Sequence, residues 1–170
     1  EKFEHIFIKG LSDDGGLFLP KQIKKLSDKE FLNLRNLSYV DLATEIISRF
    51  TGDFCSSEKL HQIVKKSYST FNEHNVVKVK KVEDLHVLEL FHGPTLAFKD
   101  VAMQLIGNFY EYYLSKNTKK INIIVATSGD TGAAAIDAVK GKKNINIFVL
   151  HPNNRISPCL LYTSDAADDD

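Results

Sequence analysis

The sequence lacks the features that define several protein classes. It has only two cysteines, Cys55 and Cys159, and no run of about 18 apolar residues that could cross a bilayer. It has no basic segment followed by an apolar one, which a secretory signal requires. Two cysteines are too few for a disulfide framework and lack metal-ligand spacing. We therefore expect a globular cytoplasmic protein with no membrane partner.

Clusters of histidine or of one charge are scarce as well. The six histidines show no paired spacing such as HExxH, so no metal site is expected. The 22 lysines and arginines are dispersed and form no nucleic-acid footprint. Formal net charge is zero, but four of the 22 acids lie in 159–170, which holds no base. The remaining 18 acids leave residues 1–158 with a surplus of four positive charges, which is compatible with small anionic substrates.

The last twelve residues, 159–170, continue no pattern that precedes them. They resemble the translation of a sequencing-library adapter, and such a scar is left out of fold reasoning. We expect a non-native tail here. The alternative is a natural acidic tail, solvated and without fixed structure.

Residues 1–80 have the pattern of a mainly helical section. Ser38 and Asp41 have capping-box spacing, followed by one apolar stripe and then a Thr51-Gly52-Asp53 turn. The stripe consists of Leu42, Ile46, Ile47 and Phe50. Ser57 is placed to cap a second helix. The expected buried face of that helix is Leu60, Ile63, Val64, Tyr68 and Phe71. Gly15-Gly16 is interpreted as a plain turn.

From about residue 76 the periodicity changes. Short β-branched or apolar runs at 85–91, 121–126 and 145–150 alternate with helical patterns at 99–114 and 131–139. This order predicts a parallel α/β architecture. Apolar residues on both sides of 121–126 predict a strand covered on two faces. The basic run 140–143 is interpreted as the end of a helix.

One lysine, Lys99, stands between Phe98 and Asp100, just after a Gly93-Pro94 turn and where a helical pattern begins. An apolar shell and the positive end of a helix both disfavour the ammonium form of a lysine. An unprotonated amine forms a Schiff base with an aldehyde cofactor such as pyridoxal phosphate. The alternative is a solvated residue in the first turn of the helix, where most isolated lysines lie.

Small polar residues follow the run 121–126 in the order Thr-Ser-Gly-Asp-Thr-Gly. Backbone amides at the start of the next helix attract an anion. The loop is neither a phosphate-binding Walker loop, because no lysine follows its second glycine, nor a dinucleotide fingerprint. An ordinary strand-to-helix turn is the alternative. If 85–91 belongs to the same sheet, Lys99 and this loop face one crevice at the carboxyl edge.

Three segments resemble those of one enzyme family. Residues 88–100 resemble the cofactor-lysine segment of threonine synthases, in particular the microbial and fungal branch. Residues 14–20 resemble the family's N-terminal signature and 126–134 its substrate loop. The resemblance runs from about residue 5 to Pro158. It implies a fold-type-II pyridoxal-phosphate enzyme, with a mainly helical section at 1–80 and the first part of a parallel α/β cofactor-binding domain at 81–158.

The resemblance also implies an activity, the conversion of O-phospho-L-homoserine and water to L-threonine and phosphate. Lys99 would carry pyridoxal 5'-phosphate and, once freed by substrate, act as the general base. The implied substrate-binding residues are Thr127, Ser128, Gly129, Asp130 and Thr131. In many relatives from the wider group of fold-type-II enzymes, an asparagine at the position of Asp130 contacts the hydroxyl group of the cofactor. Asp130 is therefore also the candidate cofactor contact. For His92 and Phe98, a structural histidine and a core aromatic are favoured over catalytic roles.

Two other functions stay open. One is a related pyridoxal-phosphate lyase that acts on another phosphorylated hydroxy amine, since vertebrate homologues look similar in these motifs. The other is a non-catalytic homologue that binds a small anion. The family's loop for the cofactor phosphate comes later in the chain than residue 158. We therefore expect residues 1–170 alone to be an inactive fragment, aggregated or molten, that binds no cofactor.

Overall fold

The computed structural model describes residues 1–127 and 129–153. Two compact units divide the chain between Lys65 and Lys66, within helix α4 (Ser57–Tyr68). The predicted tail at 159–170 lies outside the described residues. Among those that are described, no helix combines the length and the apolarity needed to cross a membrane.

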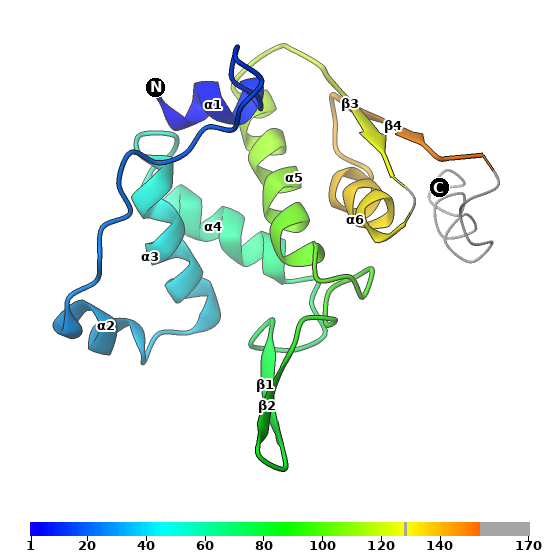
Figure 1. Ribbon diagram of the computed structural model, residues 1–170. Coiled ribbons are helices and arrows are strands. Elements are labelled where there is room, and N and C mark those ends of the chain that lie inside the picture. The colour runs from blue at the N-terminus through cyan, green and yellow to red at the C-terminus, as the bar shows by residue number, and fades with distance from the viewer. Residues whose placement is uncertain (128, 154–170) are drawn as a thin grey trace. The chain divides into compact units, whose positions relative to one another are not determined.

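The first unit contains α1 (Phe3–Lys9), α2 (Asp28–Leu34), α3 (Tyr39–Thr51) and most of α4 (Figure 1). Three aromatic rings form a cluster that joins α1 to the segment after α3. The ring centroid of Phe54 lies 5.3 Å from that of Phe3 and 6.2 Å from that of Phe7. Phe54 is only 2% exposed. Packing of the half-buried Phe3 and Phe7 rings on the buried Phe54 holds α1 in place, since no residue of this short helix is itself fully buried.

Local capping explains where α3 and α4 begin and end. The Ser38 hydroxyl accepts the Asp41 backbone N–H at 3.2 Å, and Gly52 ends α3 with a φ of 54°. Both were predicted. At α4 the prediction was one residue late, because Ser56 and not Ser57 accepts the Lys59 N–H. The two adjacent serines are equivalent in the sequence pattern, and only backbone geometry chooses between them.

The predicted apolar faces are partly right. Four of the five residues predicted for the buried face of α4 are buried, namely Leu60, Ile63, Val64 and Tyr68. Phe71 lies beyond the end of the helix and is half-buried, with its ring 5.6 Å from that of Tyr68. Phe50, predicted to lie on the α3 stripe, is 45% exposed because the stripe drifts around the helix towards its last turn.

The second unit contains β1 (Lys78–Val82), β2 (Leu85–Glu89), α5 (Asp100–Ser115), β3 (Ile121–Ala126), α6 (Asp130–Val139) and β4 (Ile145–Leu150). Strands β3 and β4 are parallel and joined through α6, as predicted. Strand β2 instead pairs antiparallel with β1. The prediction that 85–91 joins the parallel sheet is therefore wrong. The two-residue turn Glu83-Asp84 lets β2 pair with β1, its neighbour in the chain, so β2 does not need a partner strand from further along the sequence.

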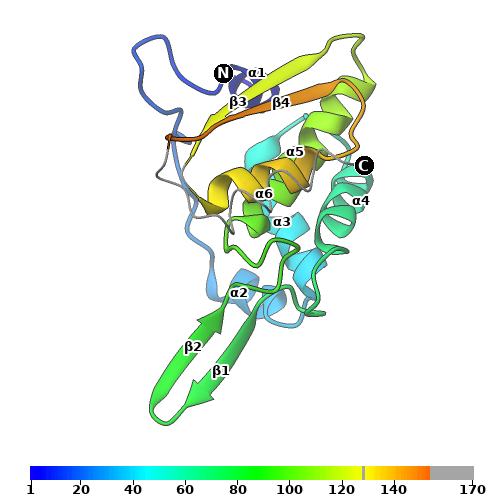
Figure 2. The same cartoon turned by 90° about the vertical axis from the view of Figure 1, so that its right-hand side faces the viewer.

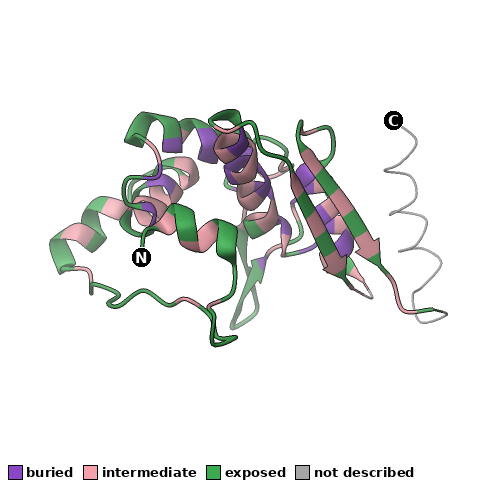
Figure 3. Cartoon of the chain, turned by 90° about the horizontal axis from the view of Figure 1, so that it is seen from above, coloured by how far each residue is buried: buried purple, intermediate pink, exposed green. Residues whose placement is uncertain are grey.

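The β3–β4 pair is covered on one face. Figures 1 and 2 show α6 beside the pair, and alternate strand residues are half-buried and exposed, as the stripes in Figure 3 show. On the open face Ile124 is 70% and Phe148 55% exposed. The prediction of two covered faces is thus wrong for the described residues, because α6 packs against both strands and the opposite face stays exposed.

Candidate functional site

The segment that precedes α5 is a compact double turn. The Leu96 N–H donates to the Gly93 carbonyl at 3.1 Å, and the Asp100 N–H donates to the Ala97 carbonyl at 3.0 Å. Leu96 has a φ of 62° and is largely exposed. A left-handed backbone at a residue other than glycine costs about 1 kcal/mol or more. Surrounding contacts must hold this turn in place.

The contact that holds it is made by Asp100. Its carboxylate is fully buried and accepts the Thr95 backbone N–H at 2.8 Å and the Thr95 hydroxyl at 2.7 Å. A Cβ at Gly93 would overlap the same carboxylate, so only glycine leaves room for it. The Gly-Pro-Thr turn and the first residue of α5 therefore form one packed unit.

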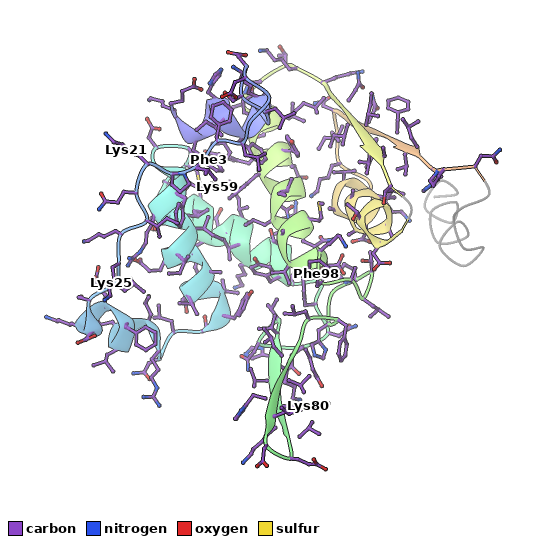
Figure 4. All side chains as sticks on the ribbon, in the orientation of Figure 1. Phe3, Lys21, Lys25, Lys59, Lys80 and Phe98 are labelled. Carbon is purple, nitrogen blue, oxygen red and sulfur yellow. The ribbon has the colours of Figure 1, made fainter. Side chains whose placement is uncertain are left out.

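Lys99 lies at the point where this unit becomes helical, as its sequence position predicted. It precedes α5 with helical backbone angles, and its side chain is half-buried. The amine lies 4.3 Å from the ring centroid of Phe98 and has no ion pair with any described residue. Phe98, labelled in Figure 4 at the start of α5, is 60% exposed, so its assignment to the core is wrong. Its ring flanks the lysine instead of packing inside.

His92 lies in a separate ion-pair group, as the structural interpretation predicted. Its Nε2 lies 3.0 Å from the Glu89 carboxylate, which also accepts the Lys80 amine at 2.7 Å. The hydrogen bond from Lys80 is the main cause that holds the pKa of Glu89 below its usual value. The His92 carbonyl accepts the Asn72 N–H at 2.9 Å. These contacts tie the hairpin to the segment before it.

The second motif connects β3 to α6. The Thr127 hydroxyl accepts the Gly129 N–H at 3.2 Å, and the Gly129 carbonyl accepts the Gly132 N–H at 3.0 Å. A Cβ at Gly132 would lie 2.5 Å from the Thr127 methyl group, so this glycine permits close packing of helix on strand. Asp130 is exposed and Thr131 half-buried. Ser128, a predicted substrate residue, lies outside the described residues.

Helix packing, and not a shared sheet, relates the two motifs. The helices that follow them, α5 and α6, are in contact. The Gln104 side-chain amide donates to the Asp137 carboxylate at 2.5 Å. The conditional expectation that both motifs lie on one sheet edge fails, because β2 belongs to the hairpin. Each motif nevertheless lies at the N-terminus of one of two packed helices.

A polar network that sequence reasoning missed lies along the same two helices. Lys142, predicted only as part of a helix-ending loop, donates to Asn108 at 2.7 Å and to Glu111 at 3.2 Å. Lys66 also donates to Glu111, at 2.6 Å. Burial lowers the pKa of Lys142 despite its bond to Glu111. A lysine three residues after the end of a helix carries no sequence signal for such burial.

An open cavity of about 340 Å³ adjoins this network. Its polar lining includes Lys66, Ser69, Thr70, Asp137, Lys140 and Lys142. It lies along the middle of α5 and away from Lys99. In the described part of the chain, no group of three or more histidine, cysteine or carboxylate side chains is placed to hold a metal ion.

Comparisons with known proteins bear on this arrangement. A family model described as "Threonine synthase N terminus" matches residues 1–68. The threonine synthase of Saccharomyces cerevisiae is 43% identical over 92% of this chain, and the match covers 33% of the yeast protein. Of solved structures, yeast threonine synthase superposes with a TM-score of 0.89 at 41% identity, covering 95% of this chain and 35% of that one. A structure titled PLP-bound threonine synthase from Brucella melitensis gives a TM-score of 0.88 at 40% identity, with the same coverage.

The fold therefore places the chain in the α/β class of fold type II, to which the solved structure titled PLP-bound threonine synthase belongs. Within that class, the chain matches the N-terminal part of the threonine synthase family. It spans about a third of the length of the relatives it matches.

Proposed function

We propose that this chain supplies the cofactor lysine and the substrate loop of a threonine synthase, which converts O-phospho-L-homoserine and water to L-threonine and phosphate. The observation that carries the proposal is the setting of Lys99. Its amine is half-buried beside an aromatic ring, follows a rigid turn, and pairs with no described carboxylate. Such an amine is free to react with an aldehyde.

The residues on both motifs fit pyridoxal phosphate and an amino-acid substrate. The Lys99 amine would hold the cofactor and, once released, carry a proton to and from the substrate α-carbon. The cofactor, when bound, supplies an electron sink for that proton removal. The first turn of α6 presents backbone amides that favour a carboxylate. We assign substrate binding to Thr127, Ser128, Gly129, Asp130 and Thr131, and a cofactor contact to Asp130.

Proposals on domain organisation, location and partner accompany this one. Residues 1–80 would form the helical section and residues 81–158 the first part of the cofactor-binding domain. We also propose a cytoplasmic location, with a small phosphorylated amino acid as the partner and neither nucleic acid nor membrane.

The test uses a completed enzyme, in which residues 1–153 of this chain replace the aligned segment of yeast threonine synthase. This design supplies the remaining length of that relative. Pyridoxal phosphate is bound, the adduct is fixed with borohydride, and the labelled lysine is identified by peptide mapping. Lys99→Ala should abolish the adduct and threonine formation.

A matched control is Lys116→Ala. The Lys116 amine lies 4.1 Å from the ring centroid of Tyr112, so like Lys99 it lies beside an aromatic ring, but it does not follow the turn. This variant should keep both the adduct and the activity. An adduct on any lysine other than Lys99 would refute the assignment. Activity on a different phosphorylated hydroxy amine in preference to O-phosphohomoserine would refute the substrate while leaving the lysine assignment intact.

A further inference from the structure

The Asp100 carboxylate is unusual in being buried without a cation. It is fully inaccessible to solvent, and no described lysine, arginine or histidine forms an ion pair with it. A buried carboxylate is costly unless hydrogen bonds replace its lost water. Thr95 provides two such bonds, from its backbone N–H and its hydroxyl. The N-terminus of α5, where Asp100 is the first residue, adds a favourable dipole.

The two Thr95 bonds close a loop around Lys99. Thr95 and Asp100 are five positions apart, and Lys99 directly precedes the buried Asp100. On its other side, the Lys99 carbonyl accepts the Met103 N–H at 2.9 Å and the Ala102 N–H at 3.1 Å. The Lys99 backbone is thus fixed from both directions. The strained Leu96 lies within this closed loop, and Gly93, just before it, packs against the Asp100 carboxylate.

We propose that Asp100, through Thr95, is a positioning residue for Lys99. By closing the turn, Asp100 fixes the direction in which the Lys99 side chain extends from the backbone and so presents the amine to pyridoxal phosphate. This inference rests on the proposed function. The rival role for Asp100 is that of a helix-capping acid that stabilises α5 and has no effect on the reactivity of Lys99.

Four variants of the completed enzyme separate the two roles. Thr95→Val removes the hydroxyl donor and keeps the shape of the side chain, whereas Thr95→Ser keeps both bonds. Asp100→Asn keeps shape but loses a charge. Asp28→Asn is the control, because Asp28 is likewise the first residue of its helix but is exposed. The readout is the borohydride-fixed label on Lys99 relative to Lys116, together with the melting temperature, kcat and KM.

We expect Thr95→Val and Asp100→Asn to lower the Lys99-to-Lys116 ratio about tenfold, the scale of one lost hydrogen bond to a charged group. Kcat should fall with it. Thr95→Ser and Asp28→Asn should leave the ratio unchanged. A lower melting temperature with an unchanged ratio would show a capping role alone and overturn the inference.

The failure of the proposed function has a different signature. If the unsubstituted enzyme shows no preference for Lys99 over Lys116, the lysine assignment fails and the inference falls with it. If the preference is present but insensitive to all four variants, only the positioning inference fails. If Asp100→Asn does not fold, the comparison of Thr95→Val with Thr95→Ser decides by itself, since the serine variant retains the hydroxyl and the valine variant does not.

Discussion

Gly107 of α5 lies directly against the backbone of Ala138 in α6. A Cβ at position 107 would overlap the Ala138 carbonyl oxygen, so the two helices approach as closely as a glycine allows. Ala134 and Ala138 are both buried. Small side chains therefore set the spacing of the two helices that follow the lysine turn and the proposed substrate loop.

Gly107→Ala should destabilise the completed enzyme even though alanine is the better helix former. Overpacking costs about 1–3 kcal/mol, against a propensity gain of about 1 kcal/mol. The expected result is a lower midpoint in urea. The reverse exchange at the exposed Ala102 of the same helix, Ala102→Gly, is the control and should cost about 1 kcal/mol through propensity alone. A higher midpoint for Gly107→Ala would contradict the close packing.

Lys99→Arg should fail to restore the reducible adduct, although it preserves charge and length. A guanidinium does not lose its proton in a protein and so cannot attack the aldehyde. The measurement is the bound-cofactor absorbance together with the peptide map. Lys116→Arg serves as the matched exchange and should leave both unchanged. Cofactor bound covalently in Lys99→Arg would show that another lysine does the chemistry.

Gly132→Ala should raise the KM for O-phosphohomoserine, because its new methyl group would press on the Thr127 methyl group and displace the start of α6. Adding Thr127→Ser removes that methyl group while keeping the hydroxyl that accepts the Gly129 N–H. The double variant should therefore recover most of the lost affinity. The label on Lys99 should stay constant throughout. No recovery in the double variant would mean that the glycine is required for another reason.

Acid should weaken the link between α5 and the loop after α6. Burial by itself raises the pKa of Glu111, but hydrogen bonds from Lys66 and Lys142 outweigh it and leave the pKa lowered. A group with a lowered folded-state pKa stabilises above its unfolded-state pKa, and this stability is lost as pH falls through the folded-state pKa. Urea midpoints from pH 7 down to pH 3 should therefore fall less steeply in Glu111→Gln.

The control for that experiment is Glu58→Gln, a change at an exposed acid in the first turn of α4. Its pH profile should follow that of the unsubstituted protein. Parallel profiles for Glu111→Gln and the unsubstituted protein would remove Glu111 from the account of acid stability.

The open face of the β3–β4 pair should make the 170-residue chain self-associate. Ile124, Phe148 and Leu150 expose apolar surface there, and such patches recruit other chains. Phe148→Lys should lower the apparent mass in sedimentation at the same protein concentration. Asn122→Lys adds the same charge on the same face without removing apolar surface, and should have a smaller effect. Equal effects would point to charge and not to the apolar patch.

Much of the local structure could be read from the residues. Ser38 and Gly52 bound α3 as their types predict, and α5 and α6 begin within one residue of the expected positions. These features depend on neighbours within about four positions, which the sequence displays directly. The motif around Lys99 likewise identified the family, because its residue types are specific in their order.

Tertiary structure decided what depends on distant partners. Strand β2 could pair with β1 or with the parallel strands, and the hairpin formed because its turn needs only two residues. The burial of Lys142 depends on Asn108 and Glu111 from another helix. In the sequence, Asp100 looks like an ordinary acidic residue at the start of a helix. Only the folded turn, which encloses its carboxylate, shows that it is buried. The sequence by itself thus determined where the helices lie and which reactive side chains the protein carries. Packing determined which of those side chains are buried and held in place, because burial depends on spatial neighbours that the order of residues does not show.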